Sequence, residues 1–177
     1  MDRQRFFTGK AYDEFLMETD GYQDLYRHHY QRAVVADEDK AFLKKLGRLY
    51  ILVLTETWCG DSIAVLPVVR KWIESVEEVT MRILSRDENP DVMDNYLTNG
   101  GRSIPKFVFF DQAFREIGSW GPRPQCIQAI FEQHRDAIKA GEIEKSEVIK
   151  KMRRGYAADK GKSIIQEMKE LLTSRSK

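Results

Sequence analysis

One apolar run, Leu49–Thr55, constrains the fold of this chain more than any other segment. Its apolar side chains stand at consecutive rather than alternate positions, which is typical of a short β-strand buried on both faces. Such a strand needs neighbouring strands beside it and helices over both faces of the sheet. The rest of the chain must therefore supply more strands and several helices.

The residues from 48 to 139 alternate between strand-like and helix-like patterns. Strands are expected at 49–55, 79–84, 106–110 and 114–119, and helices at about 62–76, from 89–90 onward and at about 124–139. The short link 111–113 between the last two strands predicts a hairpin. The order β-α-β-α-β-β-α predicts an α/β fold in which helices cover a mixed central sheet.

The segments on either side of this block have apolar residues at helical spacing. We expect a helical N-terminal extension at 1–47, the core at 48–139 and a helical C-terminal extension at 140–177, with two helices joined near Gly161. No low-complexity linker or internal repeat separates these segments. We therefore expect a single domain over 1–177, with the extensions packed on the core.

The composition narrows the class of protein. The chain has 177 residues, of which 42% are hydrophobic and 32% charged, as in ordinary globular proteins. A net charge of +1 argues against nucleic acid or an anionic membrane as a partner. No apolar run approaches the ~20 residues of a membrane-spanning helix. Residues 1–8 lead into no apolar stretch, so we expect no secretory signal.

The cysteine content points to a reducing compartment. The chain has two cysteines, Cys59 and Cys126, too few for a secreted disulfide scaffold. We therefore expect a cytoplasmic protein with free thiols. Cys126 lies in an apolar helical stretch, and we expect it to be buried and structural. The adjacent His28 and His29 lack the spacing of a zinc site, so no metal is expected.

The motif Trp58–Ser62, with the sequence Trp-Cys-Gly-Asp-Ser, places a cysteine where the helix after the first strand begins. Backbone N–H groups and the helix dipole favour a thiolate at such a position. The carboxylate of Asp61 disfavours a second negative charge nearby. We expect the Cys59 thiolate to be partly formed at neutral pH. The alternative is an inert, half-buried cysteine.

A second motif, Ile104-Pro105, stands directly before the strand at 106–110. Together with Trp58–Ser62 and Pro67, it resembles the thioredoxin superfamily over roughly half of the chain. The whole chain is similar to a bacterial group of thioredoxin-like proteins with helical extensions. The resemblance implies a thioredoxin-like fold and a cis Ile104–Pro105 bond beside Cys59.

Two positions depart from the family pattern. Ser62 stands where thioredoxins carry the resolving cysteine, and Val53 stands where they carry a buried acid on the preceding strand. Without a second thiol, an internal disulfide cannot form. We expect the Ser62 hydroxyl to act beside Cys59 by hydrogen bonding to the thiolate. The alternative for Ser62 is a helix-capping residue with no chemical role.

The resemblance also implies where a substrate binds. The backbone of Ile104 would pair with an extended substrate strand, as in β-augmentation. Trp58 and Trp120 would form apolar walls beside Cys59, although Trp120 can also be read as an ordinary core residue. The expected substrate-binding residues are Trp58, Gly60, Asp61, Ile104, Pro105 and Trp120, and the expected catalytic residues are Cys59 and Ser62.

Two functions remain open at this stage. The first is a monothiol thiol–disulfide oxidoreductase that uses Cys59 on mixed or protein disulfides. It would have no bound cofactor but a low-molecular-weight thiol as co-substrate, and its partners would be protein or small-molecule disulfides. The second is a non-catalytic binding or adaptor protein with the same fold. The sequence leaves the identity of the thiol and the oligomeric state open.

Overall fold

The computed structural model describes residues 1–174. In this part of the chain, four strands form one mixed sheet in the order β2-β1-β3-β4. The strands are β1 (Leu49–Thr55), β2 (Val79–Ser85), β3 (Lys106–Phe110) and β4 (Glu116–Trp120). β1 is parallel to β2 and antiparallel to β3, and β3 is antiparallel to β4. The α/β fold with a mixed sheet under helices is therefore confirmed.

The central strand β1 explains the apolar run in the sequence, because every residue in it is buried. Successive side chains of a strand point to opposite faces of the sheet. Leu49, Ile51 and Val53 therefore enter one apolar cluster, whereas residues 50, 52 and 54 enter another on the opposite face.

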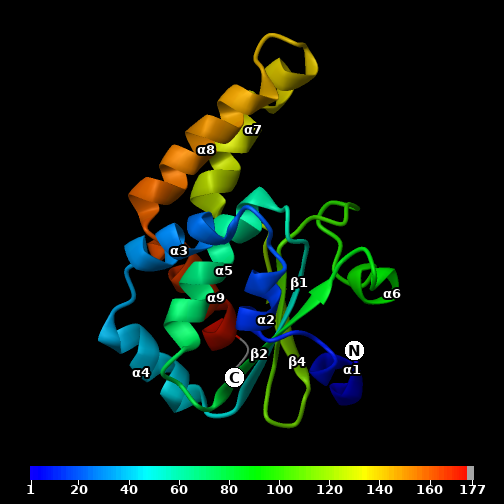
Figure 1. Ribbon diagram of the computed structural model, residues 1–177, viewed down its shortest axis with the longest axis vertical. Coiled ribbons are helices and arrows are strands. Elements are labelled where there is room, and N and C mark those ends of the chain that lie inside the picture. The colour runs from blue at the N-terminus through cyan, green and yellow to red at the C-terminus, as the bar shows by residue number, and fades with distance from the viewer. Residues whose placement is uncertain (175–177) are drawn as a thin grey trace.

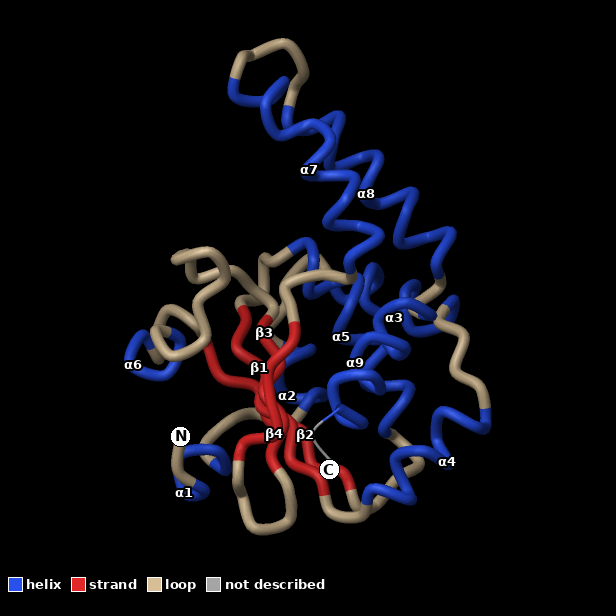
Figure 2. The backbone as a smooth tube through the Cα atoms, turned by 180° about the vertical axis from the view of Figure 1, so that it is seen from behind, coloured by secondary structure: helices blue, strands red, loops and turns tan. Residues whose placement is uncertain are grey.

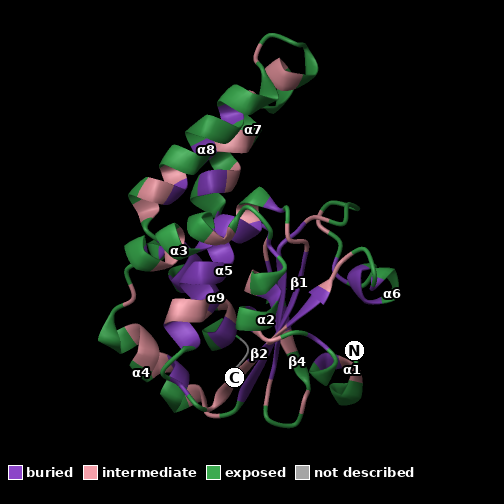
Figure 3. Ribbon diagram, in the orientation of Figure 1, coloured by how far each residue is buried: buried purple, intermediate pink, exposed green. Residues whose placement is uncertain are grey.

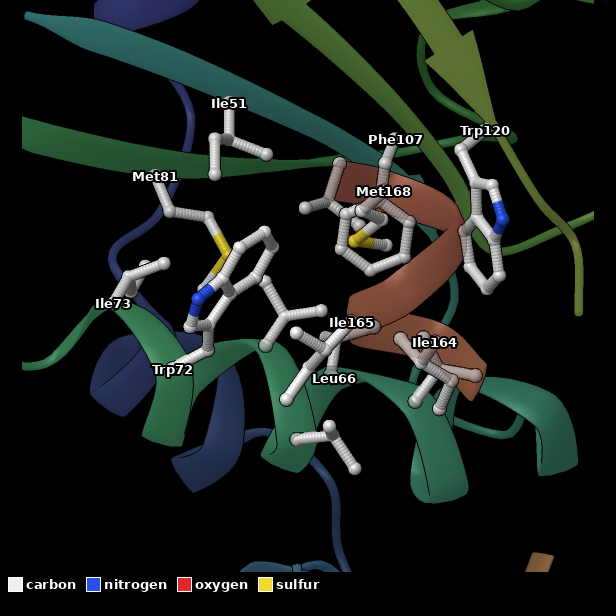
Figure 4. Close-up of a cluster of buried hydrophobic side chains, with 14 of the residues drawn as sticks. Ile51, Leu66, Trp72, Ile73, Met81, Phe107, Trp120, Ile164, Ile165 and Met168 are labelled. Carbon is white, nitrogen blue, oxygen red and sulfur yellow. The ribbon is translucent and has the colours of Figure 1, made fainter. Parts of the chain in front are cut away.

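Long helices cover the first face. They are α3 (Gln23–Arg32), α4 (Asp37–Leu46), α5 (Gly60–Ile73) and α9 (Lys162–Ser174), joined by the short α2 (Tyr12–Met17). Figure 2 shows α3, α4, α5 and α9 together on one side of the strands. Between α5, α9 and the sheet, Leu66, Trp72, Ile165 and Met168 pack with residues of the strands (Figure 4).

The opposite face has a thinner cover, made of the short helices α1 (Arg3–Phe7) and α6 (Pro90–Met93) and of loops. Phe6 packs edge to face on Tyr50, with ring centroids 5.6 Å apart. Lys10 forms an antiparallel bridge with Ile83, so the segment after α1 pairs with the outer edge of β2. Bridging of this kind protects an exposed strand edge.

The helices α7 (Gln125–Lys139) and α8 (Lys145–Asp159) form a hairpin that projects away from the sheet (Figure 1). Its far end is largely exposed (Figure 3). The helices approach closely at Gly155, where an added Cβ would lie 2.7 Å from Ile127 Cδ1. α9 then returns to the sheet. Residues 175–177 of the expected C-terminal extension lie outside the described residues.

The last strand differs from its predicted position, because β4 covers Glu116–Trp120 and not 114–119. Phe114 has a φ of +61° and therefore leaves the strand conformation. Its ring stacks on Phe110 at a centroid distance of 4.6 Å, which packs it against the thinly covered face. Within residues 1–174 no helix is both long and apolar enough to cross a membrane.

Candidate active site

Cys59 is the N-cap residue of α5, directly after the loop that follows β1. Its side chain is buried, with 6% of the residue exposed, in the apolar cluster of the thinly covered face. The thiol donates a hydrogen bond to the carbonyl oxygen of Ile104, with an Sγ–O distance of 3.4 Å. The fold therefore brings the two sequence motifs into direct contact.

Two peptide bonds in the described part of the chain are cis, Ile104–Pro105 and Gly121–Pro122. The first of these cis bonds was expected from the resemblance, and the second was not. The two loops touch: a Cβ on Gly121 would lie 2.2 Å from the carbonyl oxygen of Pro105, so this position requires glycine. The buried Lys106 ties the loops together by donating to Thr98 Oγ1 at 2.7 Å and to the Gly121 carbonyl at 3.3 Å.

Burial raises the pKa of the Cys59 thiol above its ordinary value. Hydrogen bonds from Ser62 and the backbone N–H of Asp61 lower that pKa, and the charge of Asp61 raises it further. Our expectation of a partly formed thiolate at neutral pH was therefore wrong. The helix N-terminus does favour the thiolate, but the loss of hydration around a sulfur enclosed by apolar side chains outweighs it.

Ser62 lies one turn into α5 and is fully buried. Its hydroxyl shares a hydrogen bond of 2.5 Å with the hydroxyl of Thr55 at the end of β1. The same residue supplies hydrogen bonds that lower the pKa of Cys59. Ser62 thus occupies the place of a second thiol, and a partner on β1 holds it there.

Asp61 has a largely buried carboxylate with two donors from distant parts of the chain. Arg123 Nη2 lies 2.7 Å from Oδ2, and the Tyr156 hydroxyl donates to Oδ1 at 2.8 Å. Burial raises the pKa of Asp61, and these two donors act in the opposite direction. Sequence reasoning missed both partners. Arg123 lies in the loop before α7 and Tyr156 lies on α8, and no local pattern marks either residue as a partner of Asp61.

Trp58 and Gly60 form the exposed rim of the site. Trp58 is 55% exposed, and the guanidinium of Arg86 lies 5.3 Å from its ring centroid. Gly60 has open space in the direction of an absent side chain. Both residues leave room for another molecule beside Cys59.

Trp120 does not form a wall beside Cys59, which corrects our expectation. It pairs across the strands with Phe107, so both side chains point to the face covered by long helices. In Figure 4 it lies beside Phe107 and near Met168. Its indole N–H donates to Glu167 Oε2 of α9 at 2.8 Å. Trp120 is a core residue.

Cys126 is exposed rather than buried, which also corrects our expectation. It lies at the start of α7, where the neighbouring Ile127 is the buried residue. The apolar stretch in the sequence marks one face of an amphipathic helix, and Cys126 lies outside that face. Both cysteines are free thiols.

No group of three or more potential metal ligands (His, Cys, Asp or Glu) gathers anywhere in residues 1–174. The rings of His28 and His29 lie edge to face, with centroids 5.9 Å apart.

Comparisons with known proteins agree with the fold described above. A family model described as thioredoxin matches residues 9–138. A Pseudomonas aeruginosa protein of unknown function is 19% identical, with a TM-score of 0.71, and the match covers 96% of this chain and 95% of that one. An HIV epitope scaffold is 16% identical, with a TM-score of 0.73, over 98% of this chain and 99% of the scaffold. At these identities the two structures show a shared fold. Comparison with curated proteins finds no match.

Proposed function

Since the chain belongs to the thioredoxin family, we propose that it is a monothiol thiol–disulfide oxidoreductase that uses Cys59. The observation that carries this proposal is the position of the Cys59 sulfur. It sits at the N-terminus of α5 and 3.4 Å from the Ile104 carbonyl oxygen. A sulfur held between a helix N-terminus and a backbone loop can meet a substrate disulfide at a defined place.

The proposed cycle needs two exchange steps. The Cys59 thiol loses its proton to solvent, and the thiolate attacks one sulfur of a mixed or protein disulfide. A Cys59–substrate disulfide forms, and the other substrate sulfur leaves as a thiolate that takes up a proton. The thiolate of a low-molecular-weight thiol then attacks the substrate sulfur, which releases Cys59. Because residue 62 is serine, the external thiol takes the place of a resolving cysteine.

The substrate is proposed to bind along Ile104. Within residues 1–174, no hydrogen bond to the backbone N–H of Ile104 is found. A free N–H beside the reactive sulfur suits pairing with an extended peptide. The exposed ring of Trp58 and the open surface at Gly60 would contact the same segment. We place the reaction in the cytoplasm, where small thiols are kept reduced.

Reduction of a mixed disulfide by a small thiol tests this function. The native protein, Cys59→Ser and Cys126→Ser would be compared against a panel of small-thiol adducts and one peptide adduct. We expect activity in the native protein and in Cys126→Ser, and loss of activity in Cys59→Ser. Equal rates in all three proteins, or no activity in the native protein, would contradict the proposal.

A non-catalytic binding protein is the second candidate, and one observation favours it. The raised pKa of Cys59 makes a slow nucleophile at neutral pH, whereas Trp58 remains exposed for a partner. A binder would retain partners without turnover. Capture of proteins from a lysate would then survive Cys59→Ser and fail in Trp58→Ala. If the protein is an oxidoreductase, capture should instead be lost in Cys59→Ser, and a reducing agent should release the proteins that the native protein captures.

A further inference from the structure

The carboxylate of Asp61 lies two residues from Cys59 and is largely enclosed, with 15% of its side chain exposed. A buried charge needs partners of its own. Asp61 has two: the guanidinium of Arg123, whose side chain is 18% exposed, and the Tyr156 hydroxyl. Each of its oxygens therefore accepts one hydrogen bond, and one of the donors is a full positive charge.

Both donors belong to the helical hairpin or to the loop that enters it. Tyr156 lies on α8, next to the glycine that lets α8 approach α7. Arg123 precedes α7, and its guanidinium carbon lies 5.3 Å from the ring centroid of Phe131. Arg123 therefore packs against α7 through Phe131, and Tyr156 is part of α8. Asp61 is the point where the hairpin meets the active-site loop.

Three titratable groups are near enough to Cys59 for their charges to interact with that of the thiolate. They are Asp61 of α5, Tyr26 of α3 and Tyr156 of α8. The nearby loop charges have partners elsewhere. Glu56 accepts from the Ser85 hydroxyl at 2.8 Å, and the guanidinium of Arg86 lies over the ring of Trp58. Among these groups, Asp61 is the anion whose charge opposes the thiolate.

We propose that Arg123 and Tyr156 are positioning residues for Cys59, which hold the Asp61 carboxylate in place and offset its charge so that the thiolate can form. This inference rests on the proposed function of Cys59. An opposite charge in contact with a carboxylate weakens the repulsion between that carboxylate and a neighbouring anion. The helical hairpin would then serve the reactive site and not only the stability of the fold.

The test measures the rate of Cys59 alkylation against pH with iodoacetamide, in a Cys126→Ser background that leaves one thiol. Arg123→Ala should raise the apparent pKa of Cys59 by about one unit, because the Asp61 charge loses its partner. Tyr156→Phe should raise it by less. Arg123→Lys should restore most of the native profile, since it returns the charge.

Removing the carboxylate should have the opposite effect. Asp61→Asn should lower the apparent pKa of Cys59, because the repelling charge is gone and Arg123 remains. In the double variant Asp61→Asn, Arg123→Ala, loss of the arginine should raise the pKa less than it does in the native background. This non-additivity identifies Asp61 as the group through which Arg123 acts.

Lys169→Ala is the matched control. Lys169 and Asp39 form an ion pair of 2.6 Å with similarly buried side chains, 23% and 16% exposed. Asp39 also accepts the indole N–H of Trp72 through its carbonyl, near the opposite end of α5 from Cys59. We expect Lys169→Ala to lower the thermal unfolding temperature as Arg123→Ala does and to leave the alkylation profile unchanged.

Two results would overturn the inference: an unchanged profile in a folded Arg123→Ala protein, or an equal change in Lys169→Ala. Alkylation reports thiolate formation whether or not the protein turns over disulfides. The predicted profiles without mixed-disulfide turnover would therefore support the positioning role and contradict the proposed oxidoreductase. Mixed-disulfide turnover with unchanged alkylation profiles would support the proposed oxidoreductase and contradict the positioning role.

Discussion

The two faces of the sheet are both apolar, but they are covered in different ways. One face is closed by long helices, among them α5 with 14 residues and α9 with 13. The other is closed by α1 with 5 residues, α6 with 4, and loops. β1 supplies side chains to both faces, and nothing in its sequence distinguishes them. The same strand is therefore covered by long helices on one side and by short helices and loops on the other, where Cys59 lies.

The thin cover also gives Cys59 neighbours of a different kind from those on the helix-covered face. Cys59 belongs to the cluster of the thinly covered face, together with Ile104. Helices satisfy their own backbone groups, whereas loops can present free N–H and carbonyl groups to a ligand. The thin cover can therefore offer both a sulfur and a peptide backbone, which the face under the long helices cannot.

The largest effect is expected from breaking the helix-covered face at Trp72. This side chain is fully buried, and its indole N–H donates to the Asp39 carbonyl at 2.9 Å. Trp72→Ala should lower the free energy of unfolding by about 4 kcal/mol, as measured by urea denaturation. The control Met17→Ala removes a side chain that is 72% exposed and should change it by less than about 0.5 kcal/mol. Similar values for the two variants would contradict this account of the core.

A smaller loss, with a second consequence, is expected from the thin cover. Phe6 is fully buried against Tyr50 and Phe114. Phe6→Ala should lower the free energy of unfolding by about 3 kcal/mol. It should also accelerate Cys59 alkylation in native buffer, because the short cover then opens locally and exposes the sulfur. Trp72→Ala should not accelerate alkylation to the same extent. Equal acceleration would mean that both faces open together.

Much of the fold, and the meeting of the two motifs, could be predicted from the sequence. Periodicity located β1, β2, β3 and α7 to within a few residues, because each is a strongly patterned segment. The motif pair Trp58–Ser62 and Ile104-Pro105 correctly suggested that the two segments meet. The pattern could not show which face is thick, because that depends on how α3, α4, α5 and the distant α9 pack against the sheet.

The errors have specific physical causes. Phe114 leaves the strand to stack on Phe110, so the pairing of β4 differs from the simple hairpin that the sequence suggested. Trp120 is the last residue of β4 and pairs with Phe107, which places it on the helix-covered face. The exposure of Cys126 depends on how α7 is rotated against α8. The contact between Asp61 and Tyr156 joins residues 95 positions apart, and no local pattern encodes it.

Ser62→Cys should convert the single thiol into an oxidisable pair. Residue 62 is fully buried one turn after Cys59, so a thiol there would face the Cys59 sulfur. Reduction of insulin should rise by about tenfold, because an internal thiolate now resolves the mixed disulfide. Loss of the Thr55 hydrogen bond should cost about 1 kcal/mol of stability. Ser62→Ala should share that loss of stability without the gain in activity, and a gain in both variants would contradict the mechanism.

The last expected effect concerns the dependence of stability on pH. Burial raises the pKa of Cys59 in the folded protein above its value in the unfolded chain, where it is about 8.5. A thiol is an acid, so the folded state disfavours the thiolate relative to the unfolded state. The folded state is therefore most favoured, relative to the unfolded chain, while Cys59 is protonated in both states, below about pH 8.5. This contribution to stability is lost as the pH rises from there through the folded pKa.

The free energy of unfolding of the Cys126→Ser protein, measured in urea from pH 7 to 10, should decline by up to about 1.4 kcal/mol for each unit by which the two pKa values differ. Introducing Cys59→Ser in that background should remove this part of the decline. If the decline were the same with and without Cys59, the sulfur would not be held in the apolar setting that the thinly covered face provides.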